Sequence, residues 1–251
     1  MLVGLIGAGN MARALARGWG DPVLCSDHGS GRARELADEL GGEAVSNLEL
    51  AKRADLVVLC HKPYQLDEVA QEIRAEAKAV ASVLGGTTRA NLQGMYQGTP
   101  VFKLMPNTAV EVRQGVVCYS PAPNVPAELE RDVIALFERL GSVVTLEERL
   151  MEPASAIMGV GPAYQALLAE AQVDAAVRYG LRPELAGRLV AETMSGSAAL
   201  LAANDYDTLA VRRGVTSPGG TTARGLAALE AAGVRTAFQS AIDAVILGGK
   251  S

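Results

Sequence analysis

The chain has 251 residues, and 49% of them are hydrophobic, which is enough apolar material for one large domain or two modest ones. Its formal net charge is −5 and only 4% of its residues are aromatic. A chain that is acidic and poor in aromatic residues has no general attraction for nucleic acid or for an anionic membrane surface. We therefore expect neither of these as a partner.

The cysteines and the hydropathy favour an intracellular protein without metal. Cys25, Cys60 and Cys118 are odd in number and widely spaced, which fits neither a disulfide framework nor a zinc site. Cys25 and Cys60 lie in apolar runs typical of strands, so we expect buried thiols in a reducing cytoplasm. No basic leader precedes the first apolar run, and the longest uncharged stretch, residues 153–169, is too short to span a membrane.

The first part of the chain alternates short apolar runs with helical patterns. Strands are expected at residues 2–6, 23–26, 55–60, 80–84 and 101–104, with weaker ones at 116–119 and 143–145. Helices are expected at residues 11–18, 32–40, 47–53, 66–77 and 127–140. This alternation predicts an α/β domain, residues 1–148, with a mostly parallel sheet covered on both faces.

The pattern changes near Glu147, after which almost no strand pattern remains. Helices are expected at residues 163–179, 183–203, 206–213, 221–232 and 234–247. The sequence thus predicts a second, all-α domain at residues 149–251. Its helix at 185–203 is rich in Ala, Gly and Ser, which permit close helix contact, either at a subunit interface or within the core.

A glycine-rich turn, G-A-G-N-M-A, follows the first predicted strand. Gly7 would permit a tight turn, Gly9 would let the backbone approach a pyrophosphate, and Ala12 would let the next helix pack close to the sheet. Free N–H groups at the start of that helix, which holds Asn10 and Met11, would meet the phosphate charge. This strand–turn–helix context predicts a Rossmann-type dinucleotide site.

The end of the second strand should meet the adenosine ribose. Asp27 lies 20 positions after Gly7, where a carboxylate would accept from the 2′-OH of NAD. Ser26 and the nearby Arg32 and Arg34 could instead hold the 2′-phosphate of NADP. Asp27 also fits a solvated turn residue, so these residues leave NAD and NADP both open.

Two more loops follow strands at the edge where open α/β sheets bind ligands. The segment His61-Lys62-Pro63 is expected to line the cofactor cleft through its backbone, although Lys62 also fits a solvated loop charge. Asn107, in the M-P-N-T turn, is placed to hydrogen-bond the nicotinamide ribose or carboxamide. The alternative for Asn107 is an Asx-type turn.

A glycine pair precedes the predicted helix at residues 221–232. Gly219 and Gly220 leave backbone N–H groups free at the positive end of this helix, an arrangement that holds a carboxylate well. The hydroxyl of Thr222 would project from the first turn toward a bound ligand. An ordinary loop and helix cap is the alternative interpretation of the same residues.

The stretch V-T-S-P-G-G-T-T-A-R-G-L-A-A-L-E, residues 215–230, closely resembles the signature of pyrroline-5-carboxylate reductases. The motifs G-L-I-G-A-G-N-M-A, A-D-L-V-V-L-C-H-K-P, M-P-N-T and G-V-G-P-A-Y occur in that family's order and spacing. The resemblance implies a Rossmann domain, a helical dimerisation domain and homodimers, which some members assemble further. It implies reduction of 1-pyrroline-5-carboxylate to L-proline by NAD(P)H, with NADP slightly favoured.

The resemblance also implies roles for the glycine turn. The substrate carboxylate would rest on backbone amides around Ser217, Gly219, Gly220 and Thr221. The hydroxyl of Thr222 would contact the ring nitrogen, and it is the expected catalytic group.

The chain departs from the family at several positions. Lys103 stands where the family usually has arginine, and Ala109 where it usually has proline. Met158 and Val160 replace two hydroxyl residues near the expected active site. These changes keep open a reductase of another cyclic imine carboxylate, or a protein that binds NAD(P) without turnover.

The proton chemistry agrees with an imine substrate. Reduction of a ketone creates an alkoxide, which needs a proton donor, commonly His, Lys or Tyr. No lysine lies between Lys103 and Lys250, and both histidines lie in the first predicted domain, although tyrosines are present. A β-hydroxyacid dehydrogenase, which relies on a lysine in its helical domain, is therefore disfavoured. A cyclic imine that binds already protonated needs no strong acid.

Overall fold

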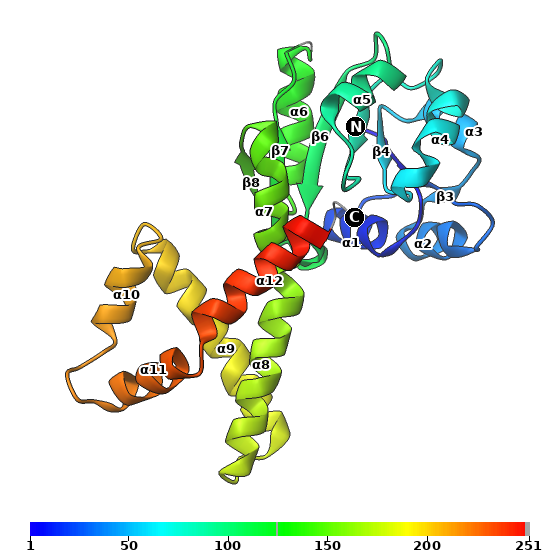
Figure 1. Cartoon of the computed structure of the whole chain (residues 1–251). Coiled ribbons are helices and arrows are strands. Elements are labelled where there is room, and N and C mark those ends of the chain that lie inside the picture. Colours follow the sequence, from blue (N-terminus) through cyan, green and yellow to red (C-terminus); the bar gives the residue numbers. More distant parts are fainter. Residues whose placement is uncertain (124, 249–251) are drawn as a thin grey trace. The chain divides into compact units, whose positions relative to one another are not determined.

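The computed structural model describes residues 1–123 and 125–248 (Figure 1). Contacts divide the chain into two compact units, Met1–Pro162 and Ala163–Ser251. The first is an α/β unit and the second is helical. The predicted boundary at residue 148 remains a prediction, and residues 249–251 of the predicted second domain lie outside the described residues.

Eight strands form one sheet in the order β3-β2-β1-β4-β5-β6-β7-β8. Neighbouring strands are parallel except β6 and β7, which are antiparallel. The strands are β1 (Val3–Ile6), β2 (Leu24–Ser26), β3 (Glu43–Ala44), β4 (Leu56–Leu59), β5 (Val80–Ser82), β6 (Val101–Pro106), β7 (Gly115–Ser120) and β8 (Gly141–Thr145). The mostly parallel sheet predicted from the sequence is confirmed.

Seven α-helices and three short 3-10 helices complete the described part of the first unit. The α-helices are α1 (Asn10–Trp19), α2 (Arg32–Leu40), α3 (Asn47–Arg53), α4 (Leu66–Ile73), α5 (Arg89–Met95), α6 (Ala127–Glu138) and α7 (Met151–Met158). The 3-10 helices are η1 (Pro63–Gln65), η2 (Thr108–Val112) and η3 (Glu148–Leu150).

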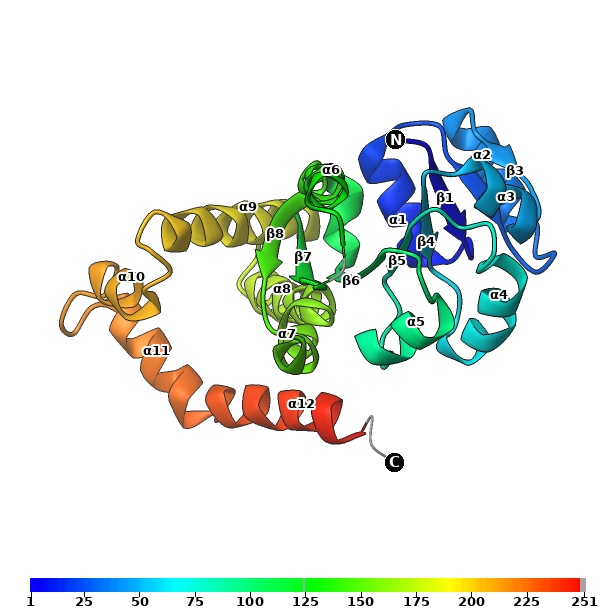
Figure 2. The same cartoon turned by 90° about the horizontal axis from the view of Figure 1, so that it is seen from above.

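Two apolar cores lie on opposite faces of the sheet, because successive strand residues point to opposite sides. Leu5 and Val58 belong to one core, with residues of α1, α2 and α6, whereas Ile6 and Val57 belong to the other, with α3, α4 and α5. Figure 2 shows α1 and α6 on one side of the strands and α4 and α5 on the other. Strands buried on both faces explain the continuous apolar runs in the sequence.

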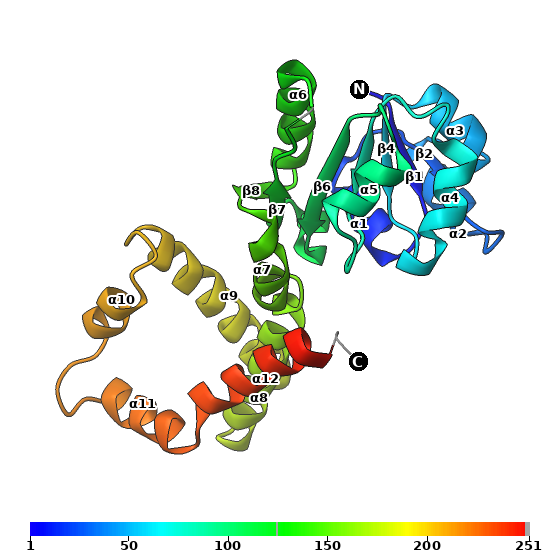
Figure 3. The same cartoon turned by 45° about the horizontal axis from the view of Figure 1, so that its top comes forward.

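The helical unit consists of α8 (Gly161–Arg178), α9 (Pro183–Ala202), α10 (Thr208–Gly214), α11 (Thr221–Ala231) and α12 (Val234–Gly248), of which α8 begins just before the division. Within the described chain, Ala186 is the one fully buried apolar residue beyond Pro162. Large side chains such as Leu167, Leu189 and Phe238 remain exposed. Figure 3 shows α9 to α12 following one another as an open series. One copy of this unit therefore has no apolar core of its own.

The helices of this second unit lie within two residues of the predicted ranges. The α-helices that the sequence pattern missed are α5 and α7, and the strand that it missed is β3. None of the described helices combines the length and the apolar character that a membrane crossing requires. The described residues also contain no cluster of three His, Cys, Asp or Glu side chains suited to a metal ion.

Candidate functional site

The predicted glycine turn lies between β1 and α1. Gly7 has a φ of +96°, and its N–H donates to the carbonyl of Ser26 at 2.9 Å. A Cβ on Gly7 would lie 2.6 Å from the backbone nitrogen of His61, whereas a Cβ on Gly9 would meet nothing within 4 Å. Gly7 is thus required by the fold, and Gly9 leaves open the space that a pyrophosphate needs.

The start of α1 carries unpaired backbone donors. Gly9 is the N-cap residue and provides no side-chain acceptor, and the first turn, which holds Asn10 and Met11, contains no acidic residue. The first backbone bond of the helix runs from the N–H of Arg13 to the carbonyl of Gly9 at 3.0 Å. The preceding N–H groups and the helix dipole favour an anion at this position. These residues fit the phosphates of a dinucleotide.

Ser26 and Asp27 end β2 but differ in what they offer a ligand. Ser26 is buried, and its hydroxyl donates to Oδ1 of Asn47 at 2.5 Å. Asp27 accepts from the N–H of Gly29 and of Ala33, both at 2.9 Å, and from the hydroxyl of Ser30. Asp27 therefore caps α2 in place of Gly31, the N-cap residue that has no side chain.

The pKa of Asp27 reflects this capping. Burial acts to raise the pKa, but the hydrogen bonds from Ser30, Ala33 and Gly29 outweigh it and hold the pKa below its ordinary value. The carboxylate is thus ionised throughout the neutral range, as a helix cap or a ribose acceptor requires.

Replacing Asp27 with alanine should lower the unfolding free energy by about 1 kcal/mol at pH 7, the usual cost of a lost cap. Because the folded pKa is depressed, this stabilisation is complete above the unfolded pKa of about 3.9 and is lost as the pH falls through the lower folded value. Urea unfolding from pH 7 to pH 3 would measure it. Asp38→Ala, on the exposed face of the same helix, is the control, and equal losses in both variants at all pH values would contradict the capping role.

The loop after β4 holds Lys62 and Pro63 in exposed positions. The N–H of Lys62 donates to Oε1 of Gln65 at 3.0 Å, which fixes the start of η1. His61, which the sequence analysis placed only through its backbone, is buried, and burial lowers the pKa of its imidazole. The sequence does contain a sign that could have marked His61: a histidine directly follows a buried strand, at the edge of the sheet where ligands bind.

Asn107 is buried at the end of β6, where its side chain is held on two sides. Its Oδ1 accepts from the N–H of Val116 at 3.2 Å, and its Nδ2 donates to the carbonyl of Met158 at 3.1 Å. The side chain therefore ties β7 and the end of α7 to this turn. The predicted contact with nicotinamide would have to use its remaining N–H or lone pair.

The second predicted site is a tight turn before α11. The N–H of Gly220 donates to the carbonyl of Ser217 at 3.1 Å, and Gly219 has a φ of +69°. Pro218 followed by a glycine in this conformation is typical of a type II turn. Gly220 is the N-cap residue without a side chain, so the N–H groups that start α11 face no internal acceptor.

The side chains around this turn are accessible. Ser217, Gly219, Thr221 and Thr222 are all exposed, and within the described chain nothing hydrogen-bonds to the hydroxyl of Thr222. Arg224 donates from its guanidinium to the carbonyl of Gly219 at 3.0 Å, which braces the turn. The turn therefore presents backbone donors and exposed hydroxyls, that of Thr222 among them, to a small anionic ligand.

Comparison with known proteins finds matches for both parts of the chain. Residues 148–250 match the family model for pyrroline-5-carboxylate reductase dimerisation, and residues 2–86 match that for NADP oxidoreductase coenzyme F420-dependent. The pyrroline-5-carboxylate reductase of Mycobacterium leprae is 34% identical over 96% of this chain and 93% of that protein. The chain belongs to the pyrroline-5-carboxylate reductase family.

Solved structures agree over the full length. The 1-pyrroline-5-carboxylate reductase of Streptococcus pyogenes has a TM-score of 0.90 at 29% identity, covering 100% of this chain and 98% of that one. The Plasmodium falciparum pyrroline carboxylate reductase with NADP bound has a TM-score of 0.88 at 29% identity, covering 100% and 97%. The predicted family and fold class are confirmed, and the chain is an NAD(P)H-dependent oxidoreductase.

Lys103, one of the departures named in the sequence analysis, has an internal partner in the structure. It is 7% exposed, its Nζ donates to the carbonyl of Thr87, and it lies 3.8 Å from Oε1 of Glu148. Burial lowers the pKa of Lys103, while the charge of Glu148 opposes this shift. Lys103 thus anchors β6 to the loop after β5.

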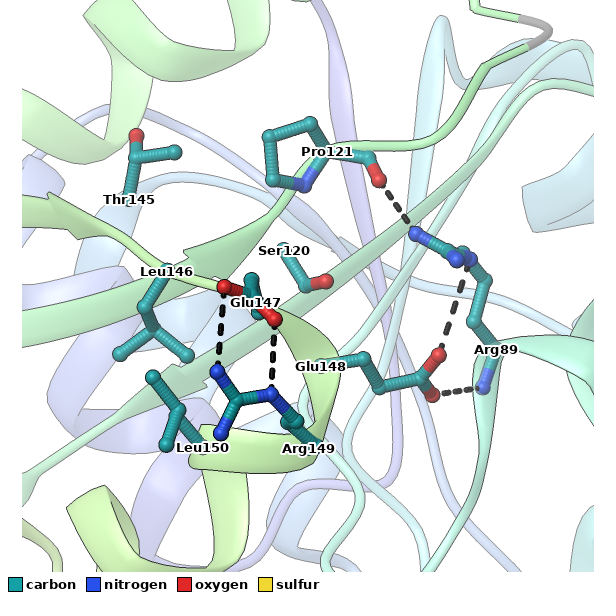
Figure 4. A pocket seen from close by; sticks show the side chains of 9 residues that line it. All are labelled: Arg89, Ser120, Pro121, Thr145, Leu146, Glu147, Glu148, Arg149 and Leu150. Atoms are coloured by element: carbon teal, nitrogen blue, oxygen red, sulfur yellow. Dashed lines mark hydrogen bonds and ion pairs between the residues drawn. The ribbon is translucent and has the colours of Figure 1, made fainter.

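A cavity of about 800 Å³ lies beside this anchor and contains none of the predicted cofactor or substrate residues. Figure 4 shows that its charged groups pair with one another: Arg89 with Glu148 and with the carbonyl of Pro121, and Glu147 with Arg149. Since these charges are neutralised internally, we do not place the reaction there.

Proposed function

We propose that this reductase converts 1-pyrroline-5-carboxylate to L-proline, with NAD(P)H on the turn at residues 7–12 and the substrate on the turn at residues 217–222. The observation that carries the proposal is the start of α11, which offers backbone N–H groups without a capping side chain. Such donors suit the carboxylate of a small acid.

The chain's own groups have simple tasks in this reaction. The free backbone N–H groups of this turn and of the start of α11 hold the carboxylate, and the hydroxyl of Thr222 orients the ring nitrogen. When bound, the reduced nicotinamide supplies a hydride to the imine carbon. Because the imine nitrogen is already protonated when the substrate binds, hydride addition to the carbon gives a neutral amine. The protein therefore need not supply a proton during the transfer.

The preferred cofactor is NADP. Both carboxylate oxygens of Asp27 accept hydrogen bonds that cap α2, so Asp27 is less available to accept from a ribose hydroxyl of NAD. Arg32 and Arg34 are exposed just after the same loop, where their guanidinium groups suit a 2′-phosphate. Initial rates with NADPH and NADH at equal concentration test this preference.

Turnover is the direct test of the function. NADPH absorbance should decay when 1-pyrroline-5-carboxylate is added, and it should decay more slowly with the six-membered piperideine carboxylate. Faster turnover of the larger ring would assign the chain to another cyclic imine acid. Tight NADPH binding without decay for either ring would overturn catalysis and indicate a nucleotide-binding protein.

We also propose that the helical unit forms a homodimer. The exposed apolar side chains of α8, α9 and α12 need a cover, and residues 148–250 match a dimerisation model. Sedimentation at micromolar concentration should give twice the chain mass of 26.1 kDa or a multiple of it. A monomer under these conditions would contradict this part of the proposal.

A further inference from the structure

The imidazole of His61 has one nitrogen without a partner. Its Nδ1 lies 2.8 Å from the carbonyl oxygen of Lys62, and a carbonyl only accepts hydrogen bonds, so Nδ1 carries the proton. In the neutral ring Nε2 is then an acceptor. This Nε2 is buried and meets no donor among the described residues, and His61 as a whole is only 7% exposed. A buried acceptor of this kind calls for a donor.

The position of His61 indicates where that donor comes from. Its backbone nitrogen lies directly beneath Gly7, since a Cβ on Gly7 would come within 2.6 Å of it. Burial lowers the pKa of His61, and the hydrogen bond between its ring and the Lys62 carbonyl opposes this shift. Gly7 itself donates to the carbonyl of Ser26 at 2.9 Å, so the glycine turn has the end of β2, where the adenosine ribose is expected, on one side and His61 on the other.

We propose that Nε2 of His61 accepts a hydrogen bond from the adenosine half of the bound dinucleotide. The donor is a ribose hydroxyl or the adenine amine, because the phosphate oxygens of the ligand only accept. The proposal rests on the proposed nucleotide site at residues 7–12. It makes His61 a cofactor-binding residue that acts through its side chain, in addition to the backbone of this loop.

The test compares two variants that each remove a buried polar atom without a partner. His61→Leu removes Nε2, and with it Nδ1 and its bond to the Lys62 carbonyl, and keeps most of the volume. Tyr96→Phe is the matched control, because the Tyr96 hydroxyl is also buried without a partner but lies in the core beside Val101, at the start of β6. Unliganded Tyr96→Phe should melt at or above the wild-type temperature, since it loses only an unsatisfied group. Unliganded His61→Leu should melt close to the wild-type temperature, since the removal of the unsatisfied Nε2 offsets the lost bond from Nδ1 to the Lys62 carbonyl.

Ligand affinity separates the two variants. His61→Leu should weaken NADPH and ADP-ribose about tenfold, the effect of one lost hydrogen bond. Tyr96→Phe should leave both affinities unchanged. A folded His61→Leu protein with wild-type affinity for ADP-ribose would overturn the proposal, as would weakening confined to NADPH. The hypoxanthine analogue of the cofactor identifies the donor: if it binds as well as NADPH, the donor is a ribose hydroxyl.

A spectroscopic measurement on the wild-type protein tests the same contact without requiring that a variant fold. The ¹⁵N resonance of Nε2 should move toward the hydrogen-bonded range when ADP-ribose is added, and an unmoved resonance would overturn the proposal. This experiment distinguishes failure of the His61 proposal from failure of the proposed reaction. If the protein binds ADP-ribose through His61 but never oxidises NADPH, only the proposed reaction is overturned. Turnover with an unmoved resonance overturns only the role of His61.

Discussion

Replacing Gly9 with valine should reduce NADPH affinity at least 100-fold while the protein stays folded. Gly9 has extended backbone angles, φ −76° and ψ −173°, that any residue adopts, and a Cβ there meets nothing within 4 Å. The unliganded fold therefore tolerates the new side chain. The branched group would occupy the space over the free N–H groups of α1, where the pyrophosphate must come close. Titration of NADPH fluorescence and thermal unfolding measure the two effects separately.

Gly7→Ala is the matched comparison for this prediction. Gly7 has a φ of +96°, and a Cβ on it would press against the backbone of residues 60 and 61. This variant should lose stability as well as NADPH binding, because the backbone cannot move aside. If Gly9→Val bound NADPH with nearly wild-type affinity, the dinucleotide could not lie over this turn.

Replacing Thr222 with alanine should lower kcat about 100-fold and change the NADPH dissociation constant less than twofold. The hydroxyl is exposed in the first turn of α11 and nothing in the described chain binds it, so its loss leaves the fold intact. Its proposed task is to orient the ring nitrogen, and misplaced reactants lose rates of this order. Steady-state kinetics with 1-pyrroline-5-carboxylate and a separate NADPH titration measure the two quantities.

Thr222→Ser serves as the rescue variant, because serine keeps the hydroxyl at the same position and should recover most of the turnover. If the alanine and serine variants lost turnover equally, the methyl group would matter and the hydroxyl would not. A large loss of NADPH binding in Thr222→Ala would contradict the assignment to the substrate.

Long, clearly bounded helices were predictable from the sequence. The range 183–203 was predicted for α9, which spans Pro183–Ala202, since Pro183 suits a first turn and Asn204 a stop. By contrast, α5 has seven residues with Leu92 as its one fully buried side chain, and α7 carries Pro153 near its start. Such short segments carry too little periodicity to stand out, and their contacts with the sheet decide their structure.

The same distinction holds for the candidate sites. Both glycine turns could be found because backbone geometry forces glycine at Gly7 and Gly219. The side-chain partnerships could not be found in this way. Asn107 meets Met158 across 51 positions, and Arg89 meets Glu148 across 59. No local pattern predicts that two residues so far apart will touch, so the structure was needed to show which polar groups are already occupied.

The helical unit also bears on how the chain matures. Among the described residues of α8 to α12 in one copy, Ala186 is the one fully buried apolar side chain, so a lone chain gains little from packing to offset the entropy of ordering these helices. In the proposed homodimer a second copy covers these side chains, which would make completion of the fold a bimolecular event. In newly made chains at low concentration, the helical unit would then be poorly ordered and sensitive to proteases. The sheet, which has its own apolar cores, would already be folded.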